Sequence, residues 1–144
     1  MSKRLVLVED SPNDVKLISD VAQQICPACR LEVFHDGGNA LEFFSRYGES
    51  ERFTASLILL DLRLPDIHGL DLLREIKGHE STRTLPVVVV TGTASPKMID
   101  DVYRMGANSV IEKSHGRQQS IEALTKALDY WLNQNIASEA QSGK

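Results

Sequence analysis

The chain has 144 residues, 42% hydrophobic and 25% charged, a composition typical of one soluble domain with a single core and no room for a second. Its 16 basic and 20 acidic residues give a formal charge of −4, without the basic excess that direct nucleic-acid binding usually needs. Residues 1–10 hold only four apolar residues before two acids, too short for a signal peptide or membrane span, so we expect a cytoplasmic protein.

Five short runs of apolar or alternating residues, each bounded by polar residues or glycine, predict β-strands. They cover residues 4–8, 30–34, 56–60, 86–90 and 109–113. Five segments with apolar residues at helical spacing lie between and after these runs and predict α-helices. Their apolar positions fall within residues 15–25, 40–44, 70–76, 99–102 and 121–131.

Residues with special backbone preferences predict several helix boundaries. Serine caps a helix and proline suits its first turn, so Ser11 and Ser95, each followed by proline, predict two helix starts. Glycine favours helix ends and predicts three of them, at Gly48, Gly78 and Gly106.

Cys26 and Cys29 have the C-x-x-C spacing of a redox pair or of half a zinc site. The pair follows a predicted helix and so meets its negative end, which works against a reactive thiol. A zinc site would need two further ligands, and neither a second cysteine pair nor a nearby histidine supplies them. We therefore expect a plain loop in which Pro27 ends the helix.

The alternation of strands and helices predicts right-handed crossovers and a parallel sheet. Runs 4–8, 56–60 and 86–90 are almost continuously apolar, which indicates that helices cover both faces of the sheet. The predicted fold is therefore a three-layer α/β sandwich of five strands and five helices. It would occupy residues 1–133, and the polar residues 134–144 would form a C-terminal tail.

Ligands of such sheets bind outside the carboxyl ends of the strands, so the residues at these ends are the functional candidates. Glu9 and Asp10 follow the first run, Asp61 the third and Thr91 the fourth, and Lys113 ends the fifth. Each of these residues alone has a plain explanation, such as a turn-forming aspartate or a solvated lysine. Four strand ends that carry this set together favour a functional site.

The chemistry of the set points to phosphoryl transfer. Three converging carboxylates repel one another, and hard oxygen ligands of this kind suit Mg²⁺. Thr91 offers a hydroxyl donor and Lys113 a compact cation, which together suit the oxygens of a phosphoryl group. Asp61 is then the natural nucleophile, since carboxylates form acyl phosphates.

Four segments of the chain resemble the motifs of response regulator receiver domains of the CheY-like kind, over about residues 4 to 132. They are "VLVEDSPND", "LILLDLRLPDIHG", "PVVVVTG" and "GANSVIEKS". The resemblance implies the flavodoxin-like strand order 2-1-3-4-5. It also implies a two-component response regulator that signals by phosphorylation-dependent protein binding.

The resemblance assigns a role to each residue of the acidic site. Asp61 would accept a phosphoryl group from a sensor histidine kinase. Glu9 and Asp10 would bind Mg²⁺, directly or through water, together with Asp61 and the backbone carbonyl of Arg63. The domain would then act as a self-modified switch with slow autodephosphorylation rather than as a turnover enzyme.

Thr91 would be the switch hydroxyl of the family, and Lys113 its phosphoryl-contacting cation. Two positions depart from the family pattern. Val110 stands where many members have an aromatic switch residue, so an aromatic rotamer switch is not expected. Ser114 stands where a cis proline is usual, and because a non-proline cis bond costs about 2.5 to 4 kcal/mol, we expect a trans or strained junction.

The Lys-Ser junction, the wording "ILLDLRLP" and the expected lack of an output domain resemble the stand-alone regulators that partner bacterial phytochromes. The resemblance therefore implies a bacteriophytochrome as the kinase partner and allows a homodimer through the last two helices. No membrane or nucleic-acid partner is expected.

Three other functions are alternatives to this one. The first is a receiver-fold interaction module that works without phosphorylation, which Val110 and Ser114 keep open. A second is an aspartyl-phosphate phosphatase, but Arg63 occupies the position of the second acid that turnover needs. The third is a flavodoxin-like cofactor binder, whose anionic ligand the acidic segment "EDSPND" would repel.

Overall fold

The predicted strands form one five-stranded parallel sheet in the order β2-β1-β3-β4-β5, as expected. The structure is a computed structural model that describes residues 3–47, 55–92, 94–113 and 116–136. Within these ranges the strands are β1 (Arg4–Val8), β2 (Arg30–Phe34), β3 (Leu57–Asp61), β4 (Val87–Thr91) and β5 (Ser109–Glu112).

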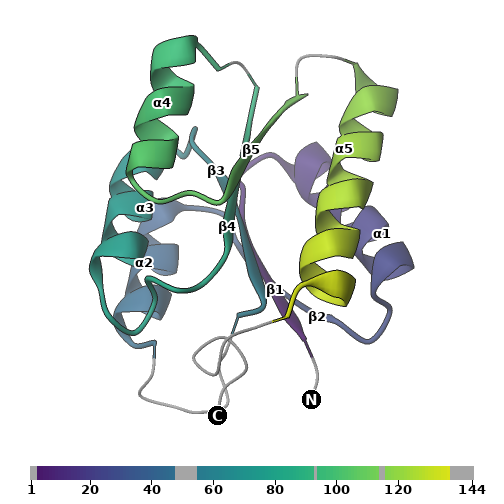
Figure 1. The fold of residues 1–144 in the computed structure, drawn as a ribbon, viewed down its shortest axis with the longest axis horizontal. Coiled ribbons are helices and arrows are strands. Elements are labelled where there is room, and N and C mark those ends of the chain that lie inside the picture. The colour runs from purple at the N-terminus through teal and green to yellow at the C-terminus, as the bar shows by residue number, and fades with distance from the viewer. Residues whose placement is uncertain (1–2, 48–54, 93, 114–115, 137–144) are drawn as a thin grey trace.

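Helices cover both faces of the sheet, so the predicted three layers are confirmed. They are α1 (Pro12–Ile25), α2 (Gly37–Ser45), α3 (Gly69–Gly78), α4 (Pro96–Arg104) and α5 (Arg117–Asp129), which continues into a π-helical turn, η2 (Tyr130–Gln134). Figure 1 shows α1 and α5 on one face and α2, α3 and α4 on the other. Among the described helices, none is long and apolar enough to cross a membrane.

The core lies in two clusters, one on each face of the sheet, and alternate residues of the inner strands feed them. On β3, for example, Ile58 and Leu60 belong to the cluster under α2, α3 and α4, whereas Leu57 and Leu59 belong to the one under α1 and α5. All five residues of both β3 and β4 are buried. Each such apolar side chain contributes roughly 1.5–3 kcal/mol to folding, which makes β3 a rigid support for its last residue, Asp61.

The strand boundaries differ slightly from those that the sequence predicts. Strands β3 and β4 each begin and end one residue later, so Asp61 and Thr91 are the last residues of their strands rather than the first residues beyond them. The reason is the register of the sheet, in which Asp61 pairs with Val90 and Thr91 with Glu112. Strand β5 ends at Glu112, so Lys113 lies just past it.

The predicted helix boundaries are largely confirmed. The side chain of Ser11 accepts a hydrogen bond from the backbone of Asp14, and that of Ser95 accepts one from Met98. Gly78 is the last residue of α3, and Gly106 follows α4 with a φ of 105°, a conformation that favours glycine. Gly48 lies outside the described residues, as do Ser114 and the end of the chain from residue 137, so the tail boundary at residue 133 stays a prediction.

The two cysteines lie in a plain turn, as expected. Cys26 caps the carboxyl end of α1, and its carbonyl accepts a hydrogen bond from the backbone of Cys29. Both thiols are free. Burial raises the pKa of the Cys29 thiol to about 12, with a further contribution from Cys26, so the thiolate required for redox chemistry is scarce at neutral pH.

Candidate functional site

Three carboxylates meet at the carboxyl edge of the sheet. Glu9 and Asp10 follow β1, Asp61 ends the neighbouring β3, and one carboxylate oxygen from each lies within 4.8 Å of the others. Glu9 and Asp61 are buried, at 1% and 6% exposure, whereas Asp10 is exposed. The sequence prediction that these three side chains converge is therefore confirmed, and their oxygens can hold a hard divalent cation.

Glu9 is the most buried charged group of the cluster. Its backbone N–H donates to the carbonyl of Phe34 on β2 at 2.9 Å, and its carboxylate accepts the backbone N–H of Ser11 at 3.3 Å. Burial and, next to it, the neighbouring Asp61 raise the pKa of Glu9 to about 7, and Lys113 acts in the opposite direction. Burial, more than the neighbouring charges, therefore disfavours the ionised form of Glu9 in this site.

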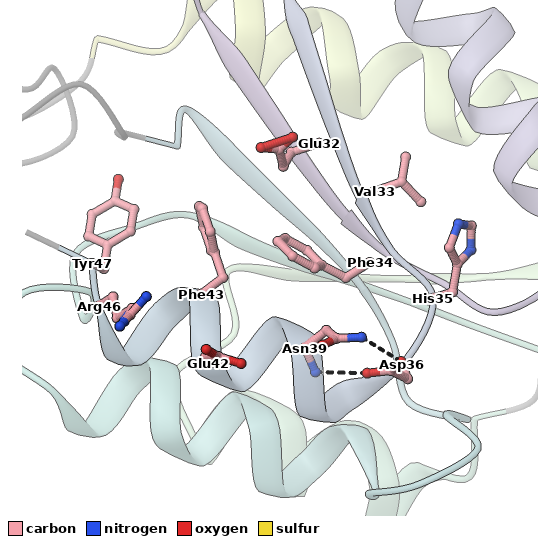
Figure 2. A pocket seen from close by; sticks show the side chains of 10 residues that line it. All are labelled: Glu32, Val33, Phe34, His35, Asp36, Asn39, Glu42, Phe43, Arg46 and Tyr47. Carbon is pink, nitrogen blue, oxygen red and sulfur yellow. Dashed lines mark hydrogen bonds between the residues drawn. The ribbon is translucent and has the colours of Figure 1, made fainter. Parts of the chain in front are cut away.

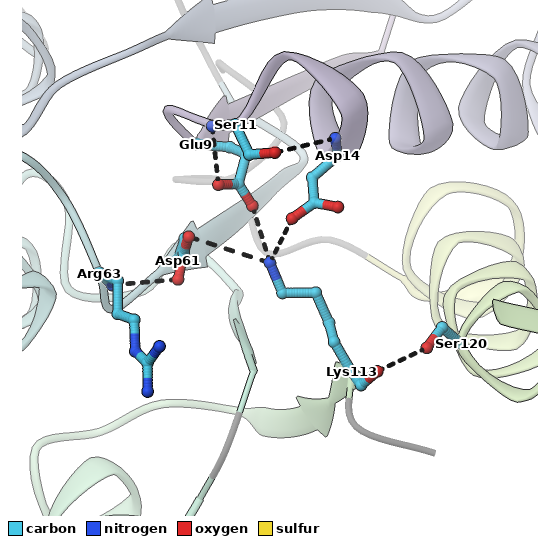
Figure 3. Close-up of polar contacts among 7 residues, drawn as sticks. All are labelled: Glu9, Ser11, Asp14, Asp61, Arg63, Lys113 and Ser120. Carbon is cyan, nitrogen blue, oxygen red and sulfur yellow. Dashed lines mark hydrogen bonds and ion pairs between the residues drawn. The ribbon is translucent and has the colours of Figure 1, made fainter. Parts of the chain in front are cut away.

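Asp61 is held by the turn that follows β3. Its Oδ1 accepts the backbone N–H of Arg63 at 3.0 Å, while its Oδ2 lies 3.9 Å from the Nζ of Lys113 (Figure 3). The end of this turn packs against its beginning, since the N–H of Gly69 donates to the carbonyl of Leu62 at 2.9 Å. A Cβ at Gly69 would lie 2.5 Å from the Leu62 Cα, so only glycine fits there.

Asp66, in the same turn, is a residue that sequence reasoning missed. Its two carboxylate oxygens accept the backbone N–H groups of Gly37 at 2.8 Å and Gly38 at 2.7 Å, at the amino end of α2. The hydrogen bond from Gly37 is the largest of the influences that lower the pKa of Asp66. Asp66 thus anchors the turn after Asp61 to a neighbouring helix.

Lys113 reaches back across the site from the end of β5. Its Nζ donates to Oε1 of Glu9 at 3.1 Å and to Oδ2 of Asp14 at 2.8 Å (Figure 3). Burial lowers the pKa of Lys113, but the bonds and charges of Asp14, Glu9 and Asp61 outweigh burial and leave the pKa above its usual value. Lys113 is therefore a firmly charged ammonium.

Asp14 is the second residue that sequence reasoning missed. It lies in the first turn of α1, three residues after the capping Ser11, where an acidic residue is ordinary. The available signal was its position in a helix that begins at the carboxyl edge of the sheet, beside the other acids. It is not one of the three clustered carboxylates.

Thr91 and Val110 lie on strands next to the acidic cluster. Thr91 is 1% exposed and ends β4, the neighbour of β3, so its hydroxyl belongs to the same edge of the sheet as Asp61. Val110, at the position where the family often has an aromatic residue, packs partly buried against the core under α2, α3 and α4. A cavity of about 420 Å³ opens over the carboxylates, Lys113 and Arg63.

A larger cavity of about 710 Å³ lies elsewhere, along the edge strand β2 and helix α2 (Figure 2). Its apolar lining comes mainly from Phe34, Phe43 and Tyr47, and it contains none of the site residues named above. The rings of Phe34 and Phe43 contact each other at 5.1 Å between centroids. This hollow is therefore separate from the carboxylate cluster.

The strand order and the acidic cluster at the carboxyl edge define a CheY-like α/β signalling domain. The family model described as "Response regulator receiver domain" matches residues 5–125, and the chain belongs to that family. It is therefore a receiver domain of two-component signal transduction, a class that signals through phosphorylation. Receiver domains are generally not turnover enzymes.

Relatives of known sequence cover most of the chain. Response regulator Rcp1 of Synechocystis sp. is 31% identical over 131 residues, which are 90% of this chain and 89% of Rcp1. The probable methanogenesis regulatory protein FilR2 of Methanothrix harundinacea is 30% identical over 131 residues, 91% of this chain and 84% of FilR2.

Two solved structures show the same fold. The Mn²⁺-bound form of Rcp1 superposes with a TM-score of 0.85 at 30% identity and covers 94% of this chain and 99% of its own. The phosphorylated cyanobacterial phytochrome response regulator RcpA has a TM-score of 0.85 at 28% identity, with 95% of this chain and 99% of its own covered.

Proposed function

We propose that Asp61 accepts a phosphoryl group from the phosphohistidine of a sensor histidine kinase. The observation that carries this proposal is the placement of the Asp61 carboxylate beside two further carboxylates and 3.9 Å from the ammonium of Lys113. An acceptor at the end of a wholly buried strand keeps a fixed position, and phosphoryl transfer depends mainly on alignment and charge neutralisation.

The transfer is a substitution at phosphorus. A carboxylate oxygen of Asp61 forms the new P–O bond as the P–N bond of the phosphohistidine breaks, and the bonding electron pair returns to the imidazole nitrogen, which takes up a proton. The product is an acyl phosphate on Asp61. Lys113 and the hydroxyl of Thr91 would then bind its phosphoryl oxygens.

We assign a divalent cation to Glu9, Asp10, Asp61 and the backbone carbonyl of Arg63, with Mg²⁺ as the expected ion. The chemistry of the donor set fits, since all of these ligands are hard oxygens and a cation would favour the ionised form of Glu9, which burial and the neighbouring Asp61 disfavour. When bound, the ion neutralises charge on the transferring phosphoryl group. The related Rcp1 was solved with Mn²⁺.

The output of the phosphorylated domain would be binding of another protein, not turnover. The residue two positions after Asp61 is Arg63, which cannot act as the acid/base group that fast hydrolysis needs, so the acyl phosphate would be long-lived enough to signal. The likeness to a phytochrome response regulator supports a bacteriophytochrome as the kinase, in the cytoplasm. A homodimer through α4 and α5 remains part of the same proposal.

Intact mass spectrometry tests the proposed acceptor directly. The protein is incubated with Mg²⁺ and a small phosphodonor such as acetyl phosphate, and wild type is compared with Asp61→Asn. We expect one added phosphoryl group on wild type and none on the variant, and no adduct in either case if Mg²⁺ is chelated. An adduct of equal yield on Asp61→Asn would overturn the assignment, and no adduct on wild type would favour a phosphorylation-independent interaction module.

A further inference from the structure

The ammonium of Lys113 has two partners that lie closer to it than the carboxylate of Asp61, the proposed phosphoryl acceptor. Its Nζ lies 2.8 Å from Asp14, 3.1 Å from Glu9 and 3.9 Å from Asp61 (Figure 3). The contact with Asp61 is therefore the longest of the three and lies outside hydrogen-bonding distance. In this state the lysine is bound by Asp14 of α1 and by Glu9, which follows β1, rather than by the acceptor.

The position of Asp14 is fixed by the start of helix α1. Its backbone N–H donates to Oγ of Ser11 at 3.4 Å, and the backbone N–H of Ser11 donates in turn to Glu9 at 3.3 Å. One capping residue thus contacts the backbone of Asp14 and the carboxylate of Glu9, the two residues that bind the lysine. At the other end, Oγ of Ser120 on α5 donates to the carbonyl of Lys113 at 3.3 Å.

Asp14 differs from Glu9 in what else it can do. Glu9 is one of the three clustered carboxylates, so a bound cation would give it a second positive partner. Asp14 is not in that cluster, and its side chain is 33% exposed against 1% for Glu9. The bond to Lys113 is therefore the contact through which Asp14 can influence the acceptor.

An ammonium has three donors on one atom, and Glu9 and Asp14 engage two of them while Asp61 lies 3.9 Å away, so a phosphoryl group on Asp61 would draw the ammonium away from these two partners. We propose that Asp14 is a positioning residue that competes with the phosphoryl group for Lys113 and thereby sets how readily the domain enters its phosphorylated conformation. This inference rests on the proposed phosphorylation of Asp61. Loss of Asp14 leaves Glu9 as the remaining close partner of the lysine, so the lysine moves to the phosphoryl group more readily and the phosphorylated conformation becomes more populated.

A double-mutant cycle tests this competition. Isothermal titration calorimetry measures the affinity for beryllium fluoride, a mimic of the phosphoryl group on a carboxylate, at saturating Mg²⁺ in wild type, Asp14→Asn, Lys113→Ala and the double variant. We expect Asp14→Asn to bind about three- to tenfold more tightly than wild type, the size expected for the net contribution of one partly exposed hydrogen bond. In the Lys113→Ala background the same change is expected to have no effect.

Two further variants of helix α1 separate this role from simple charge. Asp20→Asn removes an acid that pairs with Lys16 at 3.1 Å on the same helix, and we expect wild-type affinity. Asp14→Glu keeps the charge and is expected to restore most of the wild-type behaviour. Equal tightening by Asp20→Asn, or by Asp14→Asn without Lys113, would show a general field effect and overturn the positioning role.

A second measurement reports on the lysine itself. In ¹⁵N spectra of lysine side chains, we expect a slowly exchanging ammonium signal for Lys113 in the wild-type protein and faster exchange in Asp14→Asn. Unchanged exchange would contradict the proposal even if the affinity differs. If wild type forms the acyl phosphate but the cycle shows no coupling, only the role of Asp14 fails, whereas absence of any Asp61 adduct removes the proposed function as well.

Discussion

Strands β3 and β5 both deliver a reactive side chain to the site, but they hold it in different ways. All five residues of the central β3 are buried, and Asp61 is the last of them. All four residues of β5, at the edge of the sheet, are only half-buried, and Lys113 lies one residue beyond it. Packing therefore fixes the acceptor, while polar contacts with Glu9 and Asp14 hold the lysine.

This difference suits a switch. The acceptor must not move, since alignment determines whether phosphoryl transfer occurs. The lysine must change partners when the phosphoryl group arrives, and ion pairs to a partly exposed ammonium exchange more easily than packed side chains do. The rigid central strand keeps the acceptor in place, and the residue at the end of the edge strand is free to change partners.

Shortening a core side chain of β3 is expected to have the largest effect. Leu59 is fully buried under α1 and α5, so Leu59→Ala should lower the free energy of unfolding by about 2–5 kcal/mol. The matched change on β5, Ile111→Ala, removes a side chain that is only partly buried against the same cluster and should cost clearly less. Urea unfolding measures both. Equal losses would contradict the contrast between the strands.

The turn after β3 is the next place to weaken the acceptor. A methyl group at Gly69 would collide with the backbone of Leu62, so Gly69→Ala should destabilise the protein by about 1–3 kcal/mol and slow phosphorylation of Asp61. Gly78→Ala is the control, because no atom lies within 4 Å of the added Cβ at that position. Thermal unfolding and the adduct yield are measured for both. A neutral Gly69→Ala would mean that the turn can move.

Glu9 makes the cation affinity dependent on pH. Its pKa of about 7 in the folded protein exceeds its ordinary value of 4.5, so without metal the group favours folding below pH 4.5, and that contribution is lost as the pH rises through 7. Because a cation binds the ionised form, its affinity should fall about tenfold per pH unit below 7. Titration with Mg²⁺ at pH 6, 7 and 8 measures this dependence, and Glu9→Gln should flatten it. An equal affinity at pH 6 and 8 in wild type would show that Glu9 is not a ligand.

The sequence was sufficient to predict the fold and the convergence of Glu9, Asp10 and Asp61 at one edge of the sheet. Runs such as residues 56–60 and 86–90 have the composition of buried strands. Because ligands of parallel sheets bind at the carboxyl ends of the strands, Asp61, Thr91 and Lys113 become candidates for the site. The predicted ends of β1 and β2 are confirmed, whereas those of β3, β4 and β5 differ by one residue, because the ladder of hydrogen bonds rather than the apolar run sets where a strand stops.

Contacts between distant segments could not be predicted in this way. Asp14 and Lys113 are 99 residues apart, and in the sequence Asp14 is an ordinary acidic residue of a first helical turn. Asp66 likewise binds Gly37 from 29 residues away. Both contacts depend on how a helix end is placed against the sheet, which hydrophobic period and spacing do not specify.

A substitution at Ser120 is expected to have the smallest effect on stability. It tests whether Lys113 is held independently of Asp61. The Ser120 hydroxyl donates to the carbonyl of Lys113 from α5, and the residue is buried, so Ser120→Ala should cost about 0.5–1.5 kcal/mol in unfolding free energy. Ser19→Ala, which removes a hydroxyl bonded within its own helix to Val15, is the control. Since packing of β3 fixes Asp61, the backbone amide signal of Arg63 should stay in place while that of Lys113 shifts. A shift of both signals would mean that acceptor and lysine are held as one unit.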